Sequence, residues 1–198
     1  MKHPVMEGNA SQEHQNTNPR GSLLGYTVVV LGLALFIRFF IAAPYVVSGA
    51  SMDPSFDDWH YLIIDRISYD IGAPQRGDVV VFNLPQEGGR SLIKRIIGLP
   101  HETVVLDGQK VTIFNDEHPD GSTLEELYLD PKNLEGRNEM RIELGEDEYF
   151  VLGDNRRVSA DSRLWGTLAR ENIVGRAFVR LYPFDQISLL PGEARYEE

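Results

Sequence analysis

The most apolar part of the chain lies near its N-terminus, at residues 23–37, where 15 successive residues carry no charge. Apolar residues continue after Arg38 to about Ala43, so a helix of about 20 residues is possible, which is the length that a bilayer core requires. Pro44 disfavours helix at the residue before it. The pattern therefore predicts a transmembrane anchor helix over residues 23–43.

Residues 1–22 are polar and lack periodicity, which is typical of a disordered tail. Lys2 and Arg20 favour a cytoplasmic location for this tail, whereas Arg38 argues slightly for the opposite orientation. The apolar run also fits a cleaved signal peptide, because its length is within the allowed range and Ser48 and Ala50 are acceptable cleavage-site residues. The long polar tail and the apolar residues beyond the run argue against that alternative.

After Pro54 the pattern changes to short β-branched and aromatic runs that are separated by turn residues. Such runs, without alternating helices, predict a mostly β domain of antiparallel sheets over residues 44–198. We expect strands within 60–69, 78–82 and 90–100, hairpins over 103–114 (turning at Asp107-Gly108) and 141–153, and a strand pair over 172–184. A short helical piece is expected around 124–129, and the C-terminal PGEARYEE is expected to be mobile.

Composition limits the possible functions. The chain has 19 Lys and Arg against 30 Asp and Glu, a net charge of −11. Such a surface repels phosphate backbones, so nucleic acid is not an expected partner. The chain has no cysteine, which excludes disulfides and a cysteine nucleophile. The histidines lack the spacing of a metal site or a classical triad, so we expect no metal and no other cofactor.

Two stretches are candidates for chemistry: SMDP at 51–54 and GDNRRVSADSRLWG at 153–166. A nucleophilic serine needs a base, and without a suitable histidine a lysine of lowered pKa is the remaining option. Of the three lysines after residue 44, only Lys94 lies in an apolar strand, where it and Arg95 point to opposite faces. The alternatives stay open at this stage: Ser51 as a turn serine, the lysine on a water-facing edge strand, and the loop as a solvated turn.

Four stretches, in this order, resemble the conserved boxes of bacterial type I signal peptidases, in particular the shorter Gram-positive forms. They are SMDP (51–54), RGDVVVF (76–82), KRIIGLP (94–100) and GDNRRVSADSR (153–163). The resemblance extends from the apolar segment to about Phe184. It implies that Ser51 is the catalytic nucleophile and Lys94 the general base.

The last stretch is expected to support this pair. The resemblance implies that Ser159 hydrogen-bonds the amine of Lys94, and that Asp161 and Arg163 hold the frame of the site. Asp154 belongs to the same loop and can join its ion pairs and side-chain-to-backbone bonds.

The chain departs from the family pattern in three places near these residues. One is the stretch SFDDWHYLIID after Ser51, which replaces a more usual Thr-Leu…Gly-Asp pattern and leaves the shape of that loop open without touching the Ser–Lys pair. Gly49 stands two residues before the nucleophile, where some members have a serine that helps the oxyanion hole. The hole is then expected to rest on backbone amides. Arg157 stands where the family often has Asp, which we interpret as a surface change.

The resemblance implies a membrane-bound serine endopeptidase with a Ser/Lys dyad, a cytoplasmic N-terminus and an extracytoplasmic catalytic domain. It would cleave preproteins after Ala-X-Ala-type sites, with signal peptides and the lipid bilayer as partners, and act as a monomer. Met52, Phe56 and Trp59 are candidates to rest on lipid, with core packing as the alternative. Two rival functions are a Ser–Lys self-cleaving repressor, which would need a DNA-binding N-terminal domain, and an anchored β domain that binds partners without catalysis.

Overall fold

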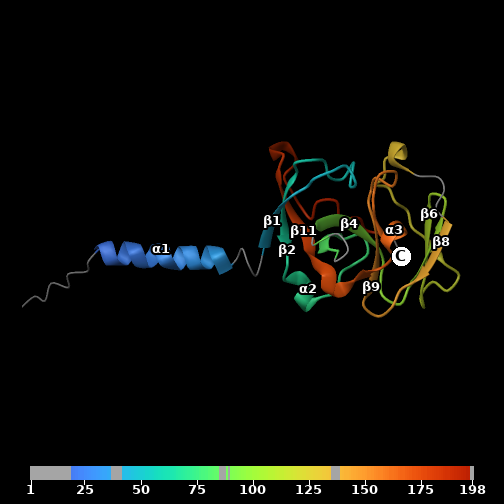
Figure 1. The fold of residues 1–198 in the computed structure, drawn as a ribbon, viewed down its shortest axis with the longest axis horizontal. Coiled ribbons are helices and arrows are strands. Elements are labelled where there is room, and N and C mark those ends of the chain that lie inside the picture. Colours follow the sequence, from blue (N-terminus) through green and yellow to red (C-terminus); the bar gives the residue numbers. More distant parts are fainter. Residues whose placement is uncertain (1–18, 37–41, 85–87, 89, 135–138, 197–198) are drawn as a thin grey trace, which may run out of the picture. The chain divides into compact units, whose positions relative to one another are not determined.

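The computed structural model describes residues 19–36, 42–84, 88, 90–134 and 139–196, and the chain divides into two units (Figure 1). The first unit spans Met1–Phe36 and the second spans Ile37–Glu198. Each unit is described by itself.

The first unit contains helix α1, which runs from Pro19 to Phe36. The helix begins four residues earlier than expected, because residues 19–22, which the sequence pattern assigned to the polar tail, are helical. The rest of that tail lies outside the described residues. Ala42 and Ala43 open a strand rather than end the helix, and residues 37–41 lie outside the described ranges. Of the helices that the structure describes, none is long and apolar enough to cross a membrane, so the expected transmembrane helix is not seen.

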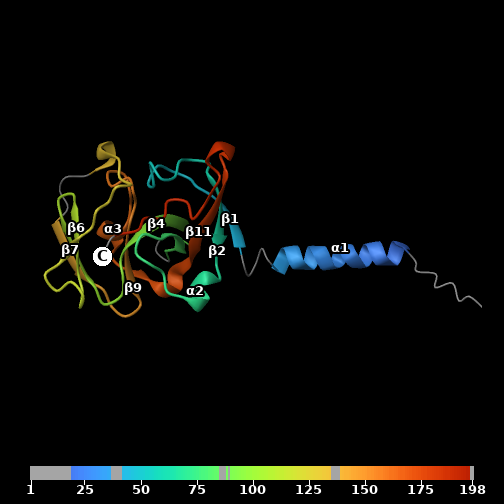
Figure 2. The same cartoon turned by 180° about the vertical axis from the view of Figure 1, so that it is seen from behind.

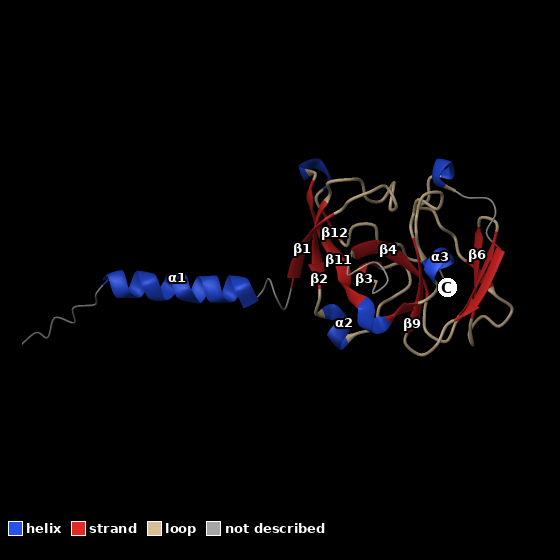
Figure 3. Ribbon diagram, viewed as in Figure 1, coloured by secondary structure: helices blue, strands red, loops and turns tan. Residues whose placement is uncertain are grey.

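Most strands of the second unit form one antiparallel sheet, drawn in red in Figure 3. Its order is β1-β2-β11-β3-β4-β9-β10, and β12 pairs with β11. The antiparallel pairing agrees with the sequence prediction. The bounds are β1 (Ala42–Val46), β2 (Tyr61–Asp65), β3 (Val79–Asn83), β4 (Ser91–Gly98), β9 (Glu148–Leu152), β10 (Leu168–Ala169), β11 (Ile173–Tyr182) and β12 (Ser188–Leu189).

A smaller sheet of order β7-β6-β5-β8 lies at the other end of this unit from β1 and β2 (Figure 2). Its strands are β5 (Thr103–Asp107), β6 (Lys110–Phe114), β7 (Ser122–Thr123) and β8 (Glu139–Glu143). The expected hairpin over 103–114 is present, with Asp107 paired to Lys110. The two turn residues are therefore Gly108 and Gln109 rather than Asp107 and Gly108. Gly108 has φ +61°, and a glycine at the first turn position suits a type II′ turn.

Three local expectations are wrong. Strands β8 and β9 do not form a hairpin, because β8 pairs with β5 and β9 pairs with β4. Residues 173–182 form the single long strand β11 rather than a strand pair. Residues 124–129 contain no helix, and a 3₁₀ turn, η3 (Pro131–Asn133), follows them. The other short helices among the described residues are α2 (Ser68–Ile71), α3 (Ser162–Trp165), η4 (Arg170–Asn172) and η5 (Phe184–Gln186).

The larger sheet is buried on both faces around β3. Val80 and Val81 point to opposite faces, and each belongs to a different hydrophobic cluster. This explains why the sequence of β3 is a continuous apolar run without alternation. A third cluster joins Ile97 of β4 and Leu152 of β9 to the inner side chains of the smaller sheet. Strands β4 and β9 therefore connect the two sheets.

Two of the three side chains considered for lipid contact pack in the core, which was the alternative. Met52 and Phe56 are fully buried in the cluster that contains Val81, so the suggested lipid contact is wrong for both side chains. Trp59 is 74% exposed. The C-terminal segment is also packed, because the carbonyl of Gly192 accepts a hydrogen bond from the buried side chain of Arg95. The described part of the C-terminus is therefore bound to the domain rather than free.

Candidate active site

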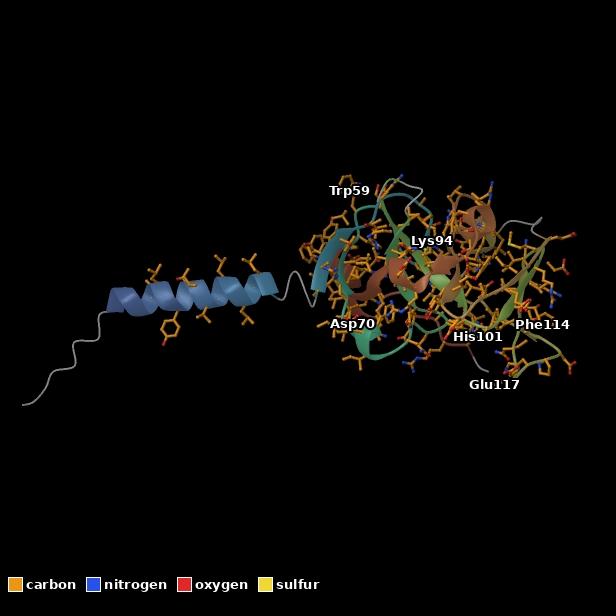
Figure 4. The ribbon with its side chains drawn as sticks, turned by 60° about the horizontal axis from the view of Figure 1, so that its bottom comes forward. Trp59, Asp70, Lys94, His101, Phe114 and Glu117 are labelled. Atoms are coloured by element: carbon orange, nitrogen blue, oxygen red, sulfur yellow. The ribbon has the colours of Figure 1, made fainter. Side chains whose placement is uncertain are left out.

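Ser51 and Lys94 are 43 residues apart in sequence, and the fold brings their side chains together. Ser51 lies in the turn that follows β1, and Lys94 lies in the middle of β4. The Nζ atom of Lys94 is 2.9 Å from Oγ of Ser51, which is hydrogen-bond distance. Figure 4 labels Lys94 among the side chains inside the β-rich unit.

The turn that contains Ser51 is held in place by Met52, the buried residue that follows it. Met52 is fully buried, and its carbonyl accepts a hydrogen bond from the backbone N–H of Phe56 at 2.9 Å. On the other side, the carbonyl of Ser51 accepts the N–H of Asn155 at 3.0 Å. The nucleophile candidate is therefore fixed to the core and to the loop at 153–163.

The amine of Lys94 lies in an environment that disfavours its charged form. Lys94 is only 3% exposed, and this burial is the main reason that the pKa of its amine is lowered to about 8. The positive charge of Arg90 lowers the pKa further, while the carboxylates of Asp161 and Asp154 oppose the shift. A substantial fraction of the amine is neutral at mildly alkaline pH, and only the neutral amine can accept a proton.

Strand β4 buries two basic side chains rather than one. Lys94 and Arg95 point to opposite faces of the strand, and both are buried, so neither of them faces solvent. Arg95 forms a two-point ion pair with Asp154, at 2.8 Å and 2.6 Å, and its guanidinium lies 3.9 Å from the ring centroid of Tyr128. Sequence reasoning missed Arg95; its position in an otherwise apolar strand was the available signal.

The loop at 153–163 is held by Asp161, whose side chain is fully buried. One carboxylate oxygen accepts the N–H of Gly153 at 3.0 Å, and the other accepts Nε of Arg163 at 2.8 Å. Arg163 in turn donates to the carbonyl of Arg156 at 2.8 Å. The three residues that the sequence placed in the frame of the site, Asp154, Asp161 and Arg163, therefore make buried contacts within or beside this loop.

Gly153 is the point of closest approach between this loop and the nucleophile. A Cβ at this position would lie 2.5 Å from the carbonyl oxygen of Ser51 and 2.2 Å from Oγ of Ser159. Neither distance can accommodate a carbon atom, so a glycine is required for the loop to pack here.

Ser159 and Gly49 are placed differently from their expected roles. The side chain of Ser159 is buried, but within the described structure its Oγ has no hydrogen-bond partner, so the expected bond to Lys94 is not seen. Gly49 has φ +95°, and its N–H donates to the carboxylate of Asp58 at 2.5 Å. That N–H is therefore already bonded in this structure, and Gly49 has no side chain to offer an oxyanion.

A cleft of about 100 Å³ leads to the Ser51–Lys94 pair between β1 and β4. Residues 91–94 of β4 pair with β3 on one side, while pairing with β9 begins only at Arg95. The other edge of residues 91–94 thus has no strand partner among the described strands, and an extended peptide could pair with it. The cleft is lined by Tyr45, Val46, Val47, Ser48, Ser51, Leu62, Val81, Arg90, Ser91, Leu92, Ile93 and Lys94.

Known proteins are similar in sequence to this chain over most of its length. A family described as "Signal peptidase, peptidase S26" matches residues 20–182. The signal peptidase I of Leptolyngbya laminosa is 39% identical over 175 residues, which cover 84% of this chain and 80% of that protein. A probable signal peptidase I-1 of Synechocystis sp. is 36% identical over 79% of both chains. The signal peptidase IB of Staphylococcus aureus is 31% identical over 80% of this chain and 90% of that protein. The chain therefore belongs to the signal peptidase family, peptidase S26.

Proposed function

We propose that this chain is a serine endopeptidase that removes N-terminal signal peptides from preproteins, with Ser51 as nucleophile and Lys94 as general base. The observation that carries the proposal is the 2.9 Å separation between Nζ and Oγ, in a site where burial lowers the pKa of the amine to about 8. Membership in the signal peptidase family supplies the substrate class.

The chemistry follows from this pair. Neutral Lys94 accepts the hydroxyl proton of Ser51, and Oγ attacks the scissile carbonyl to form a tetrahedral intermediate. The C–N bond then breaks, and the protonated lysine returns its proton to the leaving amine. The resulting ester between Ser51 and the signal peptide is hydrolysed by a water molecule that the same amine deprotonates. Backbone N–H groups near Ser51 stabilise the oxyanion in both steps, an effect worth about 3–4 kcal/mol per donor.

The cleft supports cleavage after Ala-X-Ala-type sites. Its volume of about 100 Å³ suits small side chains, and its walls include the apolar side chains of Val47, Leu62 and Ile93. The unpaired edge of β4 offers main-chain hydrogen bonds to an extended substrate. Backbone pairing gives affinity for many preproteins, and the small pocket selects the residue at the cleaved bond.

The surrounding residues have positioning roles in this proposal. Asp161 and Arg163 hold the loop that contacts Ser51, and Asp154 fixes that loop to β4 through Arg95. Ser159 orients the amine of Lys94 during catalysis. Gly49 has no side chain that could donate to the oxyanion, so backbone N–H groups form the oxyanion hole.

We further propose that α1 belongs to a single membrane anchor. The N-terminus would then be cytoplasmic and the catalytic domain extracytoplasmic, and the enzyme would act as a monomer at the bilayer surface. Support comes from side chains on the helix that are apolar and exposed. An apolar surface of this kind is unfavourable in water and favourable in lipid. These exposed side chains are Leu23, Leu24, Tyr26, Val28, Val29, Val30, Leu31, Leu33 and Leu35.

The catalytic proposal is tested by incubating the full chain in detergent with a preprotein that contains one Ala-X-Ala site. Wild type should cut after that site, whereas Ser51→Ala and Lys94→Ala should lose essentially all activity. Lys110→Ala is the matched control, because Lys110 is an exposed lysine in the smaller sheet and should keep full activity. Cleavage by Lys94→Ala at the wild-type rate would require a different base.

The anchor is tested separately by expressing the chain with a tag at each end and exposing intact spheroplasts to protease. Loss of the C-terminal tag together with protection of the N-terminal tag is the expected result. Recovery of the untreated protein in the supernatant after cell lysis and ultracentrifugation would contradict the anchor.

A further inference from the structure

Arg90 is a charged residue of the cleft that takes no direct part in the proposed chemistry. It immediately precedes β4, its side chain is exposed, and it lines the same cleft as Ser51 and Lys94. Among the described residues that line the cleft, Arg90 and Lys94 are the basic ones, and none is acidic. Because the amine of Lys94 must be neutral to act, Arg90 carries the only permanent charge in that lining.

The guanidinium of Arg90 is also unlike the other arginines around the site. Arg76, Arg95 and Arg156 each form a buried ion pair with a carboxylate. In the described part of the chain, Arg90 has neither an ion pair nor a hydrogen bond. A cation facing an open cleft, in a chain of net charge −11, is therefore available to a charge that arrives from outside.

The distance along the strand indicates which part of a substrate would meet this charge. Arg90 precedes Lys94 by four residues, which is about 13 Å in an extended chain. A substrate that pairs with the free edge of residues 91–94, with its scissile carbonyl at Ser51, has the same length per residue as the strand. Its residue beside Arg90 is then about four positions from the cleaved bond.

We propose that Arg90 is a specificity-determining residue, which favours substrates that carry an acidic side chain three to five positions from the cleaved bond. This inference rests on the proposed function, because it concerns the substrate of the same site. Aspartate or glutamate at that position pairs with the guanidinium, whereas lysine or arginine is repelled. The preference acts beside the main-chain pairing that binds all substrates.

The test is a charge scan of one peptide with a single Ala-X-Ala site. Asp or Asn is placed, one position at a time, three to five residues before and after the bond. The Asp/Asn ratio of kcat/KM is measured for wild type, Arg90→Gln, Arg90→Glu and Arg90→Lys. Because each ratio is taken within one enzyme, changes in its basal activity cancel.

Wild type should prefer Asp by about two- to fivefold at one position, which is the range of exposed ion pairs. The ratio should approach one in Arg90→Gln, invert in Arg90→Glu and persist in Arg90→Lys. It should also weaken at 1 M salt, where charges are screened beyond about 3 Å. Equal Asp/Asn ratios in wild type and Arg90→Gln would overturn the inference.

A second measurement separates this inference from the proposed function. The same peptides are titrated against the full chain carrying Ser51→Ala, with and without Arg90→Gln, and their Kd values are compared. If no enzyme cuts even the neutral peptide, the proposed function fails, while a charge preference in Kd that depends on Arg90 still supports the inference. If the neutral peptide is cut and neither kcat/KM nor Kd depends on charge, only the inference fails.

Discussion

The guanidinium of Arg95 and the carboxylate of Asp154 lie 2.6 Å apart, and their side chains are 0% and 1% exposed to solvent. Arg95 belongs to β4, directly after Lys94, and Asp154 belongs to the loop whose Asn155 N–H binds the carbonyl of Ser51. The ion pair therefore connects the strand that carries Lys94 to the loop that binds the backbone of Ser51. It lies on the opposite face of β4 from the lysine amine.

Removal of this carboxylate should unfold the domain at a much lower temperature. Asp154→Asn leaves the guanidinium of Arg95 buried without its counter-charge, and breaking a buried pair in this way costs about 3–5 kcal/mol. For a domain of this size the loss is on the order of 10 °C in Tm. Thermal unfolding followed by circular dichroism measures it, with the exposed Asp120→Asn as control. A Tm equal to that of the control would show that the pair does not stabilise the fold.

The activity of the enzyme should rise with pH through about 8. Burial lowers the pKa of Lys94 to about 8, and only the neutral amine accepts the proton of Ser51. Below this pKa, kcat/KM should therefore fall about tenfold per pH unit, because the neutral fraction of the amine shrinks by that factor. Initial rates on a peptide substrate between pH 6 and 10 give the profile. A flat profile between pH 6 and 8 would contradict the assignment of Lys94 as base.

Replacement of Arg90 by a neutral residue should move this profile to higher pH. The positive charge of Arg90 lowers the pKa of Lys94, so its removal lets the amine hold its proton to a higher pH. Arg90→Gln should shift the rising limb upward, and Arg90→Lys, which keeps the charge, should not. The comparison uses a neutral peptide so that substrate charge does not contribute. A shift of the rising limb to lower pH in Arg90→Gln would contradict the expected effect of Arg90 on the pKa of Lys94.

Local sequence patterns predicted much of the fold because burial imposes them directly. The apolar runs at β2, β3 and β4 and the hairpin of β5 and β6 lie where the pattern placed them. The pairing of β8 and β9 was not predictable in this way. A turn at Gly145 permits a hairpin, but β8 completes the smaller sheet beside β5 and β9 completes the larger sheet beside β4. Long-range packing, rather than turn chemistry, decides such a choice.

The candidate site, like the fold, was predictable from the sequence only in part. Lys94 was predicted as the base because it is the one lysine after residue 44 in an apolar strand, whereas Ser51 was predicted as the nucleophile only through its family motif. The ion pair of Arg95 joins residues 59 positions apart, and no local pattern indicates which carboxylate a buried arginine will meet. The packing of Gly153 against Ser51 likewise depends on the tertiary fold.

A methyl group at Gly153 should disturb the site more than the fold as a whole. Its Cβ would meet the carbonyl oxygen of Ser51 at 2.5 Å, so the loop or the nucleophile turn must move. Overpacking of this kind costs about 1–3 kcal/mol, and movement of Ser51 away from Lys94 should lower kcat as well. Gly72→Ala is the matched control, since its Cβ would have only an ordinary contact at 3.5 Å. Wild-type kcat in Gly153→Ala would show that the contact can relax without cost.

Ser159 offers a test of positioning that is separate from stability. Its buried Oγ has no partner in the described structure, so Ser159→Ala removes no existing hydrogen bond and should leave Tm within about 2 °C. If Ser159 binds the amine of Lys94 during catalysis, kcat/KM should nevertheless fall about tenfold, the effect of one lost bond of about 1.4 kcal/mol. The rising limb of the pH profile should move with it.

Ser162→Ala is the contrasting variant for this experiment. The hydroxyl of Ser162 is also buried, but it accepts the backbone N–H of Val151 at 3.0 Å. Its removal should therefore lower Tm, because a buried N–H loses its acceptor at a cost of about 1–3 kcal/mol. The pH profile should stay that of wild type, because no contact with Lys94 is lost. If Ser159→Ala instead lowers Tm and leaves kcat/KM and its pH profile unchanged, Ser159 packs the loop and does not position the base.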